Sequence, residues 1–216
     1  MILYAATGNH GKLREFVAGR GPGLHVHVCP CYASLPTCEE TGTTFEANAD
    51  LKAEYYSRHT FGLVFADDSG LELDALGGAP GVYSARYAGP GATDAANNVK
   101  LLAELADAAA ADAGGAGGSA GGDTGGRAGG QGDSARRTAR YVCVISLARD
   151  GRTIARFRDT AEGLIISTPR GAGGFGYDPY FLFPGLGKTF AELSPEEKWI
   201  YSHRGKAFRK VLSFLQ

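Results

Sequence analysis

Residues 61–66 form an apolar run that is followed directly by two acidic residues, Asp67 and Asp68. The run predicts a buried strand, and in α/β proteins ligands bind where such strands end. Ser69 and Gly70 have the composition of a turn that would follow it. Two adjacent carboxylates repel each other, and a divalent cation removes that repulsion. Mg²⁺ in particular binds one or two carboxylates together with substrate phosphates.

Neighbouring residues on a strand point to opposite faces of the sheet, so we expect only one carboxylate, Asp68, to face such a site. A solvated turn, in which the acidic side chains bind nearby backbone N–H groups, explains the short Asp-Asp-Ser-Gly motif equally well when that motif is taken alone.

A second candidate site follows the first predicted strand, residues 2–6, where a glycine-bearing turn leads into a helix from about Leu13. A turn of this kind before a helix N-terminus binds anions through backbone N–H groups. The residues of this candidate phosphate cradle are Thr7, Gly8, Asn9, His10, Gly11 and Lys12. The pattern fits neither the Walker A loop nor G-x-G-x-x-G, and many such turns carry Gly and Asn for backbone reasons alone.

Residues 45–58 predict a helix in which Asn48 and Lys52 lie one turn apart and can face a ligand together. Thr43 and Glu46 have the spacing of a capping box at the start of this helix, which gives Glu46 a structural role. A solvated helix charge is the competing explanation of Lys52.

Composition excludes several classes of function. The 216 residues suffice for one large domain or two small lobes, and the formal net charge of −1 argues against a nucleic-acid partner. The absence of a transmembrane-length apolar run and of a signal peptide favours a cytoplasmic protein without a membrane partner. The four cysteines follow no C-x-x-C pattern, so we predict free thiols. Residues 25–31 alternate His and Cys, but their span of about 20 Å is too long for one tetrahedral zinc, so we predict no metal there.

The second half of the chain predicts a helix over residues 93–111, then a flexible Gly/Ala-rich insertion over 112–134. Strands over 140–148 and 153–166 flank an Asp-Gly dipeptide, which is a strong hairpin signal. In the glycine-rich segment 171–179 the aromatic and acidic side chains suit base stacking and base hydrogen bonding, although a strained turn with buried aromatics explains them as well. The candidate base contacts there are Phe175, Gly176, Tyr177 and Asp178.

The C-terminal region begins with a capping box at residues 194–197 and carries Lys198, His203 and Arg204 before the last apolar helix. Basic residues at a helix start oppose the helix dipole, which hints at a functional reason for Arg204. A histidine such as His203 is by itself more often packed or exposed than catalytic.

Several longer motifs occur in one order along the chain: TGNHGK, FEANADLKA, FADDSGLELDALGGAPGVYSARYAG, TDAANNVKLL, GGFGYDPYF and SHRGKA. On these motifs the chain resembles, over nearly its whole length, the Ham1/RdgB family of pyrophosphatases that act on non-standard purine nucleoside triphosphates. The resemblance implies an α/β fold in which an elongated mixed β-sheet with flanking helices forms two lobes of a single domain, 1–216, around a central cleft. It also implies a homodimer, a Mg²⁺ cofactor, and hydrolysis of ITP, dITP or XTP to the monophosphate and pyrophosphate, as nucleotide-pool cleansing.

The same resemblance implies roles for individual residues. Residues 7–12 and Lys52 would hold the triphosphate, and Asp68 would be both a metal ligand and the general base. Ser69 would contact substrate, and Glu39 or Glu40 would supply a second carboxylate to the metal. The residues expected to surround the purine are Phe175, Gly176, Tyr177, Asp178, Lys198, His203 and Arg204.

Two single-residue departures from the family pattern bear on these roles. Ala47 stands where the family usually has Glu, and Trp199 stands where Asn usually follows the lysine, so Trp199 is expected to reshape the base pocket. Two other functions compete with the main one. They are a Maf-like pyrophosphatase of modified pyrimidine nucleotides and a catalytically silent nucleotide-binding module.

Overall fold

The computed structural model describes residues 1–115 and 137–216, which divide into two compact units. The first unit comprises residues 1–70, 141–161 and 193–216, and the second comprises the described parts of 71–140 and 162–192. The strands are β1 (Ile2–Ala5), β2 (His25–Val28), β3 (Leu63–Leu73), β4 (Thr138–Arg149), β5 (Arg152–Ile165), β6 (Phe181–Phe183) and β7 (Lys188–Thr189). The α-helices are α1 (His10–Ala18), α2 (Phe45–Ser57), α3 (Asp94–Gly115), α5 (Pro195–Tyr201) and α6 (His203–Phe214). The 3₁₀ turns are η1 (Asp74–Leu76), η2 (Gly81–Arg86) and η3 (Phe190–Glu192).

The seven strands form one mixed sheet in the order β2-β1-β3-β4-β5-β6-β7, which confirms the α/β class. β1 pairs in parallel with β2 and with β3, whereas β6 pairs antiparallel with β5 and with β7. The predicted hairpin joins β4 to β5, and its turn residues Asp150 and Gly151 adopt φ values of 50° and 75°. Both values are those of the tight turns that an Asp-Gly dipeptide favours.

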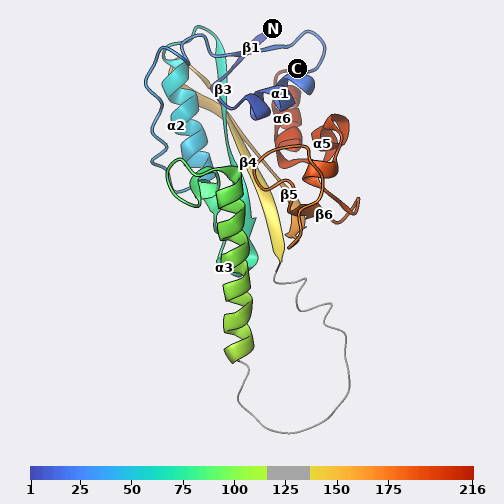
Figure 1. The fold of residues 1–216 in the computed structure, drawn as a ribbon. Helices are drawn as coiled ribbons and strands as arrows, with labels where there is room; N and C mark the ends of the chain where they lie inside the picture. Colours follow the sequence, from blue (N-terminus) through green and yellow to red (C-terminus); the bar gives the residue numbers. More distant parts are fainter. Residues whose placement is uncertain (116–136) are drawn as a thin grey trace, which may run out of the picture. The chain divides into compact units, whose positions relative to one another are not determined.

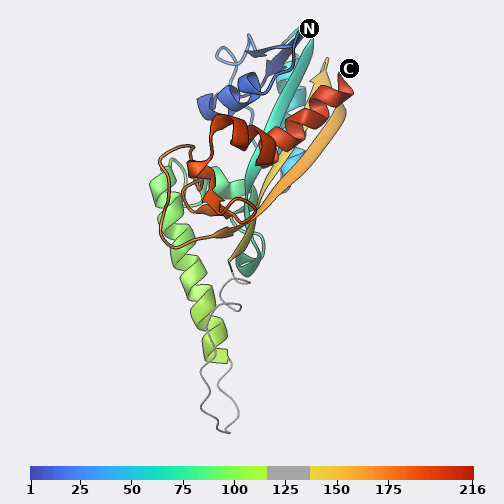
Figure 2. The same ribbon diagram turned by 90° about the vertical axis from the view of Figure 1, so that its right-hand side faces the viewer.

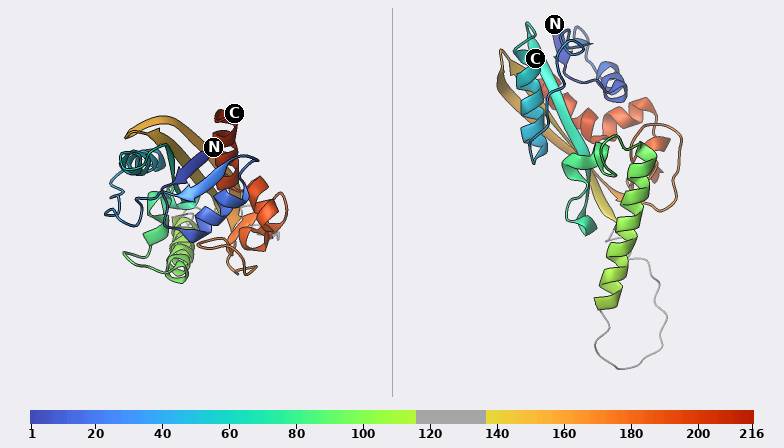
Figure 3. Two further views of the ribbon diagram at one scale, coloured as in Figure 1. Left: turned by 90° about the horizontal axis from the view of Figure 1, so that it is seen from above. Right: turned by 60° about the vertical axis from the view of Figure 1, so that its left-hand side comes forward.

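Helices cover both faces of the sheet in the first unit (Figures 1 and 3). On one face Phe16 of α1 and Phe208 of α6 pack against Phe65 of β3. On the other face Ala53 and Tyr56 of α2 belong to a separate apolar cluster. That second cluster contains Val64 and Ala66 of β3, together with Ala6, Cys29 and Ala148. β3 therefore alternates between two cores, as period-2 side-chain geometry requires.

The predicted end of this strand is wrong. β3 does not stop before Asp67; it continues through Asp67, Asp68, Ser69 and Gly70 to Leu73, and the chain turns only at η1. The physical reason is that cationic side chains meet each carboxylate on its own face of the sheet, so the pleat continues without leaving a buried charge unpaired.

The helix starts also differ from the predicted ones by a few residues. α1 begins at His10, three residues before the expected Leu13, because Asn9 caps it. α2 is capped by Thr44 rather than Thr43, and the Thr44 hydroxyl accepts from the Ala47 N–H. Since Glu46 then lies outside a capping box, its structural role is an ion pair with Arg158 of β5, at 2.7 Å.

Helices α5 and α6 follow each other on the α1 side of the sheet (Figure 2). The predicted capping box of α5 is present, with Ser194 and Glu197 bonding reciprocally. Trp199 of α5 lies edge-on to Phe208 with ring centroids 6.0 Å apart, and it packs against the core between α1 and α6. The expectation that Trp199 reshapes a base pocket is therefore not supported, because its ring fills this apolar interface.

In the second unit, α3 confirms the helix predicted over residues 93–111 and buries Leu101 and Leu105. Residues 112–115 of the predicted insertion 112–134 belong to the end of α3, and the rest of that insertion lies outside the described residues. No helix in the described ranges is both long enough and apolar enough to span a membrane.

Candidate functional site

The parallel pairing of β1 with β3 places the predicted phosphate cradle beside the two carboxylates. Ala5 lies opposite Phe65, and the Ala6 N–H donates to the Phe65 carbonyl at 2.8 Å. The loop after β1 therefore leaves the sheet next to Asp67, two residues further along β3. Lys12, in the first turn of α1, reaches across this step to Asp67.

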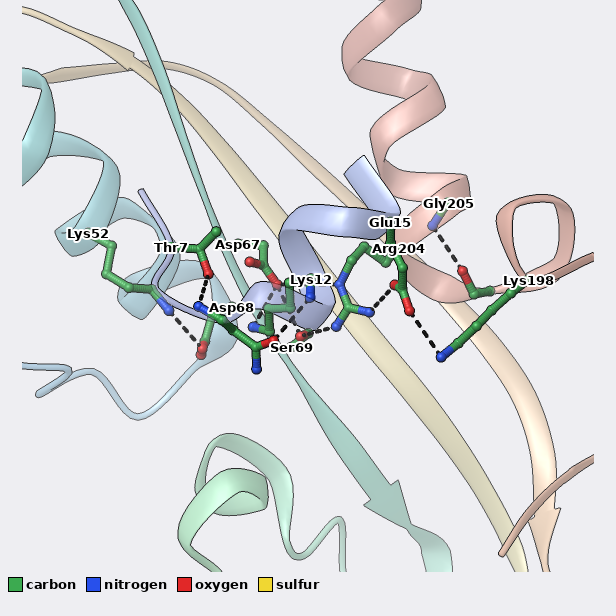
Figure 4. Close-up of polar contacts among 12 residues, drawn as sticks. Thr7, Lys12, Glu15, Lys52, Asp67, Asp68, Ser69, Lys198, Arg204 and Gly205 are labelled. Carbon is green, nitrogen blue, oxygen red and sulfur yellow. Dashed lines mark hydrogen bonds and ion pairs between the residues drawn. The ribbon is translucent and has the colours of Figure 1, made fainter. Parts of the chain in front are cut away.

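Asp67 shares the α1 and α6 face of the sheet with two cationic side chains (Figure 4). Its Oδ2 lies 2.8 Å from Lys12 Nζ and 3.8 Å from Arg204 Nε, and it accepts a hydrogen bond from Ser69 Oγ at 3.1 Å. Arg204 Nη2 in turn donates to Ser69 Oγ at 3.0 Å. Sequence analysis left Asp67 out of the site, but the structure makes it the residue that joins Lys12, Ser69 and Arg204.

Asp68 points to the α2 face, where Lys52 Nζ lies 3.1 Å from its Oδ1 and Asn48 Nδ2 donates to its Oδ2 at 3.3 Å. The same Lys52 ammonium lies 2.7 Å from Glu40 Oε1. Of the two glutamates left open by the sequence, Glu40 is thus the one near Asp68, and Glu39 is exposed.

Asn48 also fixes the segment that carries Glu40. Its Oδ1 accepts from the Gly42 N–H at 2.8 Å, and a Cβ at Gly42 would come within 2.7 Å of that oxygen. Such a contact leaves no room for a side chain. Only glycine therefore lets residues 39–42 approach α2 closely enough to bring Glu40 to Lys52.

In the phosphate cradle, side chains bond to the backbone of the helix start itself. Asn9 Oδ1 accepts from the Lys12 N–H at 3.0 Å, and Thr7 Oγ1 accepts from the Asn9 N–H at 3.2 Å (Figure 4). These bonds order the turn. The N-terminus of α1, which is the positive end of the helix dipole, then lies next to the Lys12 side chain. An anion would accordingly meet the helix terminus and the lysine rather than the side chains of Thr7 and Asn9.

Glu15 of α1 is a site residue that sequence analysis missed. One of its carboxylate oxygens pairs with Arg204 Nη1, and the other lies 3.0 Å from Lys198 Nζ. The available signal was spacing, since Glu15 stands three residues after Lys12 and so on the same side of the helix. Glu15 therefore connects the phosphate cradle to Lys198 and Arg204, two predicted base contacts.

The eight charged residues just described form what we call the ionic cluster. Its members are Lys12, Glu15, Glu40, Lys52, Asp67, Asp68, Lys198 and Arg204. Four cations and four carboxylates balance in formal charge. A highly anionic ligand would leave such a site with excess negative charge, so the carboxylates of Asp68 and Glu40 suit a hard divalent cation that arrives with the ligand.

The two adjacent aspartates have opposite pKa shifts. Burial alone would raise the pKa of Asp67, but the Lys12 ammonium and the Arg204 guanidinium outweigh it and lower that pKa to about 2. Burial raises the pKa of Asp68, with a contribution from Glu40, against the opposing effect of Lys52. Neighbouring acids with well-separated pKa values are typical of active sites in which one acid stays ionised and the other accepts or donates a proton.

His203, at the start of α6, is buried and stacks on Tyr141 with ring centroids 4.6 Å apart and planes 8° from parallel. Burial, with the nearby Arg204 and Lys198 cations, lowers the pKa of His203 well below its ordinary value. The imidazole is therefore neutral at physiological pH and does not add a further positive charge to the ionic cluster.

We expect the free energy of unfolding to fall as pH drops below about 6.5, because the unfolded chain then binds a proton at His203 that the folded chain excludes. At pH 5.5 this single group should cost about 1.4 kcal/mol. Urea unfolding between pH 7.5 and 5.5 should show that loss in the wild type and not in His203→Phe, which keeps a ring to stack on Tyr141. Parallel pH profiles would contradict the prediction.

Two of the four predicted base contacts in the second unit are held within that unit. Tyr177 is buried and its hydroxyl donates to the Ser84 carbonyl at 2.8 Å. Asp178 is also buried, and its Oδ2 accepts from the Phe175 N–H at 2.9 Å. For Tyr177, whose ring is buried, these contacts fit the alternative of a turn with buried aromatic side chains. Phe175 and Gly176 are both half-buried.

The fold and the ionic cluster define an α/β protein whose polar site lies beside the carboxyl end of a parallel strand. Comparison with known proteins then gives the family: the chain belongs to the Ham1 family, which its residues 3–116 and 127–214 match. A relative from Exiguobacterium sibiricum, named dITP/XTP pyrophosphatase, is 45% identical over 212 residues, covering 98% of this chain and 95% of its own. Another of that name, from Geobacillus kaustophilus, is 46% identical over 210 residues, covering 97% and 91%.

Solved structures agree with this assignment. The Ham1 protein of Staphylococcus aureus is 39% identical, with a TM-score of 0.76 over 100% of this chain and 98% of its own. A HAM1 protein from Coxiella burnetii is 36% identical, with a TM-score of 0.78 and the same coverage. At these identities the likeness extends to the sequence as well as the fold, and the family predicted from the motifs is confirmed.

Proposed function

We propose that the protein hydrolyses non-standard purine nucleoside triphosphates, namely dITP, XTP and ITP, to the nucleoside monophosphate and pyrophosphate. It is a nucleoside triphosphate pyrophosphohydrolase that removes altered purines before they enter DNA or RNA. The names of the two relatives described above support this function. Within the molecule, the observation that carries it is the pair Asp67 and Asp68, each facing its own lysine beside the helix N-terminus of the cradle.

Mg²⁺ is the proposed cofactor, and Asp68 and Glu40 would hold it. In the part of the chain that the structure describes, no three His, Cys, Asp or Glu side chains gather into a metal-binding group. This fits an ion that takes few protein carboxylates and completes its shell with water and substrate phosphates. When bound, the ion would neutralise charge that develops on the phosphate oxygens.

The protein's own residues supply the rest of the chemistry. Asp68 accepts a proton from the attacking water, for which its raised pKa suits it. The new bond forms between water oxygen and phosphorus as the α–β phosphoanhydride bond breaks, and pyrophosphate leaves with that electron pair. Lys12 and Lys52 stabilise the anionic oxygens, and Asp67, which stays ionised, orients Lys12 and Ser69.

Base selectivity needs hydrogen-bond donors that face the 6-oxo group. Lys198 and Arg204, both held by Glu15, are the proposed donors of the first unit. An adenine would present its own amino donor there, and a buried donor left unpaired costs about 1–3 kcal/mol. We also propose that residues 175–178 of the second unit take part in base recognition. The homodimer remains a prediction from the family resemblance.

The experiment is pyrophosphate release from XTP, dITP, ITP, ATP and GTP, measured side by side with Mg²⁺ and again with excess EDTA. We expect release from the first three to exceed release from ATP and GTP about 10-fold or more in kcat/KM. Chelation should abolish release, because the carboxylates of the site would then repel the triphosphate.

The other outcomes identify the competing functions. A modified pyrimidine triphosphate is added to the same panel, and release from it alone would indicate a Maf-like specificity. No release from any triphosphate, with binding retained, would indicate a silent nucleotide-binding module. The ion pair of Asp68 with Lys52, beside that of Asp67 with Lys12, disfavours the second of these, since a silent module has no use for a candidate base held by a lysine.

A further inference from the structure

Two side chains in the first two turns of α3 hydrogen-bond to both backbone polar groups of Gly176. The Gly176 N–H donates to Asp94 Oδ2 at 2.7 Å, and the Gly176 carbonyl accepts from Asn98 Nδ2 at 3.0 Å. Asn98 Nδ2 also donates to the Asp94 carbonyl at 2.9 Å, which ties the two together. Two side chains one helical turn apart thus hydrogen-bond to a single residue of the segment 171–179. All of these contacts lie within the second unit.

Gly176 needs such a hold because of its backbone. Its φ is +64°, in the left-handed region that favours glycine, and a glycine in a loop loses more conformational entropy on ordering than other residues. The neighbouring residues are fixed from other directions, through the Tyr177 hydroxyl on Ser84 and the Phe175 N–H on Asp178. Asp94 and Asn98 restrain the peptide groups on both sides of Gly176, between these two anchors.

The burial of Asn98 indicates that this contact is more than incidental. Asn98 is 6% exposed, whereas Val99, the next residue of the same helix, is 69% exposed. Burying an amide and exposing an aliphatic side chain reverses the usual arrangement on a helix. Hydrogen bonds lower the cost of burying the amide: Asn98 Nδ2 donates to the carbonyls of Asp94 and Gly176, whereas Oδ1 has no hydrogen-bond partner among the described residues.

We propose that Asp94 and Asn98 are positioning residues that set Phe175 and Gly176 for purine recognition. Neither side chain needs to touch the substrate. By fixing the Gly176 peptide groups they orient the Phe175 ring and the backbone N–H groups of the segment, so that base selectivity depends on α3. This inference rests on the proposed function, because it assigns a role in that function's base site.

Three variants and one control test the inference by steady-state kinetics with XTP and ATP. Asn98→Asp keeps the size of the side chain but sets a carboxylate oxygen against the Gly176 carbonyl, and Asp94→Ala removes the acceptor of the Gly176 N–H. For both we expect KM for XTP to rise about 10-fold with kcat within about twofold, and the preference for XTP over ATP to fall. Asp94→Asn retains an acceptor and should lie between, while the exposed Val99→Ala should match the wild type.

A second measurement detects the restraint without any substrate. Hydrogen exchange of a peptide that contains Gly176 should be faster in Asp94→Ala and Asn98→Asp than in Val99→Ala, because the hydrogen bonds that fix this residue are lost. If the wild type releases no pyrophosphate from XTP, the proposed function fails, and this measurement still decides whether α3 restrains the loop.

The inference is overturned if the wild type is active while both variants keep its KM and its XTP preference. It is also overturned if the variants lose kcat at unchanged KM in proportion to the fraction of unfolded protein, which would be the signature of a structural role alone. Unchanged hydrogen exchange at Gly176 would equally contradict it.

Discussion

Asp68→Asn should lower kcat for pyrophosphate release from XTP about 10³-fold, because the amide cannot accept a proton from the attacking water. The variant keeps the size of the side chain, and its single amide oxygen can still accept a hydrogen bond from either Asn48 or Lys52. Since Lys12 and the helix terminus are untouched, the dissociation constant for XTP should stay within about an order of magnitude. Rapid-quench single-turnover assays and equilibrium binding of XTP to the variant measure the two quantities separately.

Substitutions of the adjacent residues Glu39 and Glu40 provide the comparison for this experiment. Glu39→Gln removes an exposed charge and should leave kcat within about twofold. Glu40→Gln removes the carboxylate that shares Lys52 with Asp68 and should cost about 10- to 100-fold. Wild-type turnover by Asp68→Asn would refute the assignment of the base, and equal effects at Glu39 and Glu40 would refute the preference for Glu40.

Glu15→Gln should have the largest effect on stability. The Glu15 carboxylate contacts both Lys198 and Arg204, and burial of Arg204 makes any loss of its counter-charge costly. Removing one partner of a buried ionic network costs several kcal/mol, and since Glu15 is partly exposed we expect about 3 kcal/mol. Urea unfolding at pH 7.5 measures this. KM for XTP should rise as well, because the proposed base donors lose the group that orients them.

Glu46→Gln provides the comparison for that stability effect. Glu46 also pairs with an arginine at 2.7 Å, but both side chains of its pair with Arg158 are substantially exposed. Exposed pairs contribute little, so this substitution should cost less than about 1 kcal/mol. A cost for Glu15→Gln no larger than that of Glu46→Gln would show that burial does not amplify the Glu15 contacts.

Local patterns in the sequence predicted most of the fold. Apolar periodicity located the long helices, the Asp-Gly dipeptide located the β4–β5 hairpin, and the spacing of Ser194 and Glu197 located the start of α5. Each of these signals depends on interactions within a few residues. Local helical spacing also predicted the position of Lys52 on the helix that became α2. The structure then placed Asp68 and Glu40 beside its ammonium group.

Features that depend on distant partners were not predictable in this way. The extension of β3 through Asp67 depends on Lys12 and Arg204, which lie far away in sequence. Glu15 had a usable spacing, but its partners Lys198 and Arg204 come from the other end of the chain. Trp199 was misjudged for the same reason, since the core that receives it is assembled from α1 and α6.

Asp67 and Asp68 point to opposite faces of β3. The site is therefore more sensitive to a change in the number of residues in this strand than to a substitution on one face. A one-residue insertion or deletion in residues 63–66 would move each carboxylate to the opposite face, where it would meet the wrong lysine and the wrong core. Substitutions on either face change the direct ion-pair partner of one carboxylate at a time. Evolution can therefore replace the direct partner of Asp67 or of Asp68 separately, while any change in the length of β3 before them disrupts both carboxylates at once.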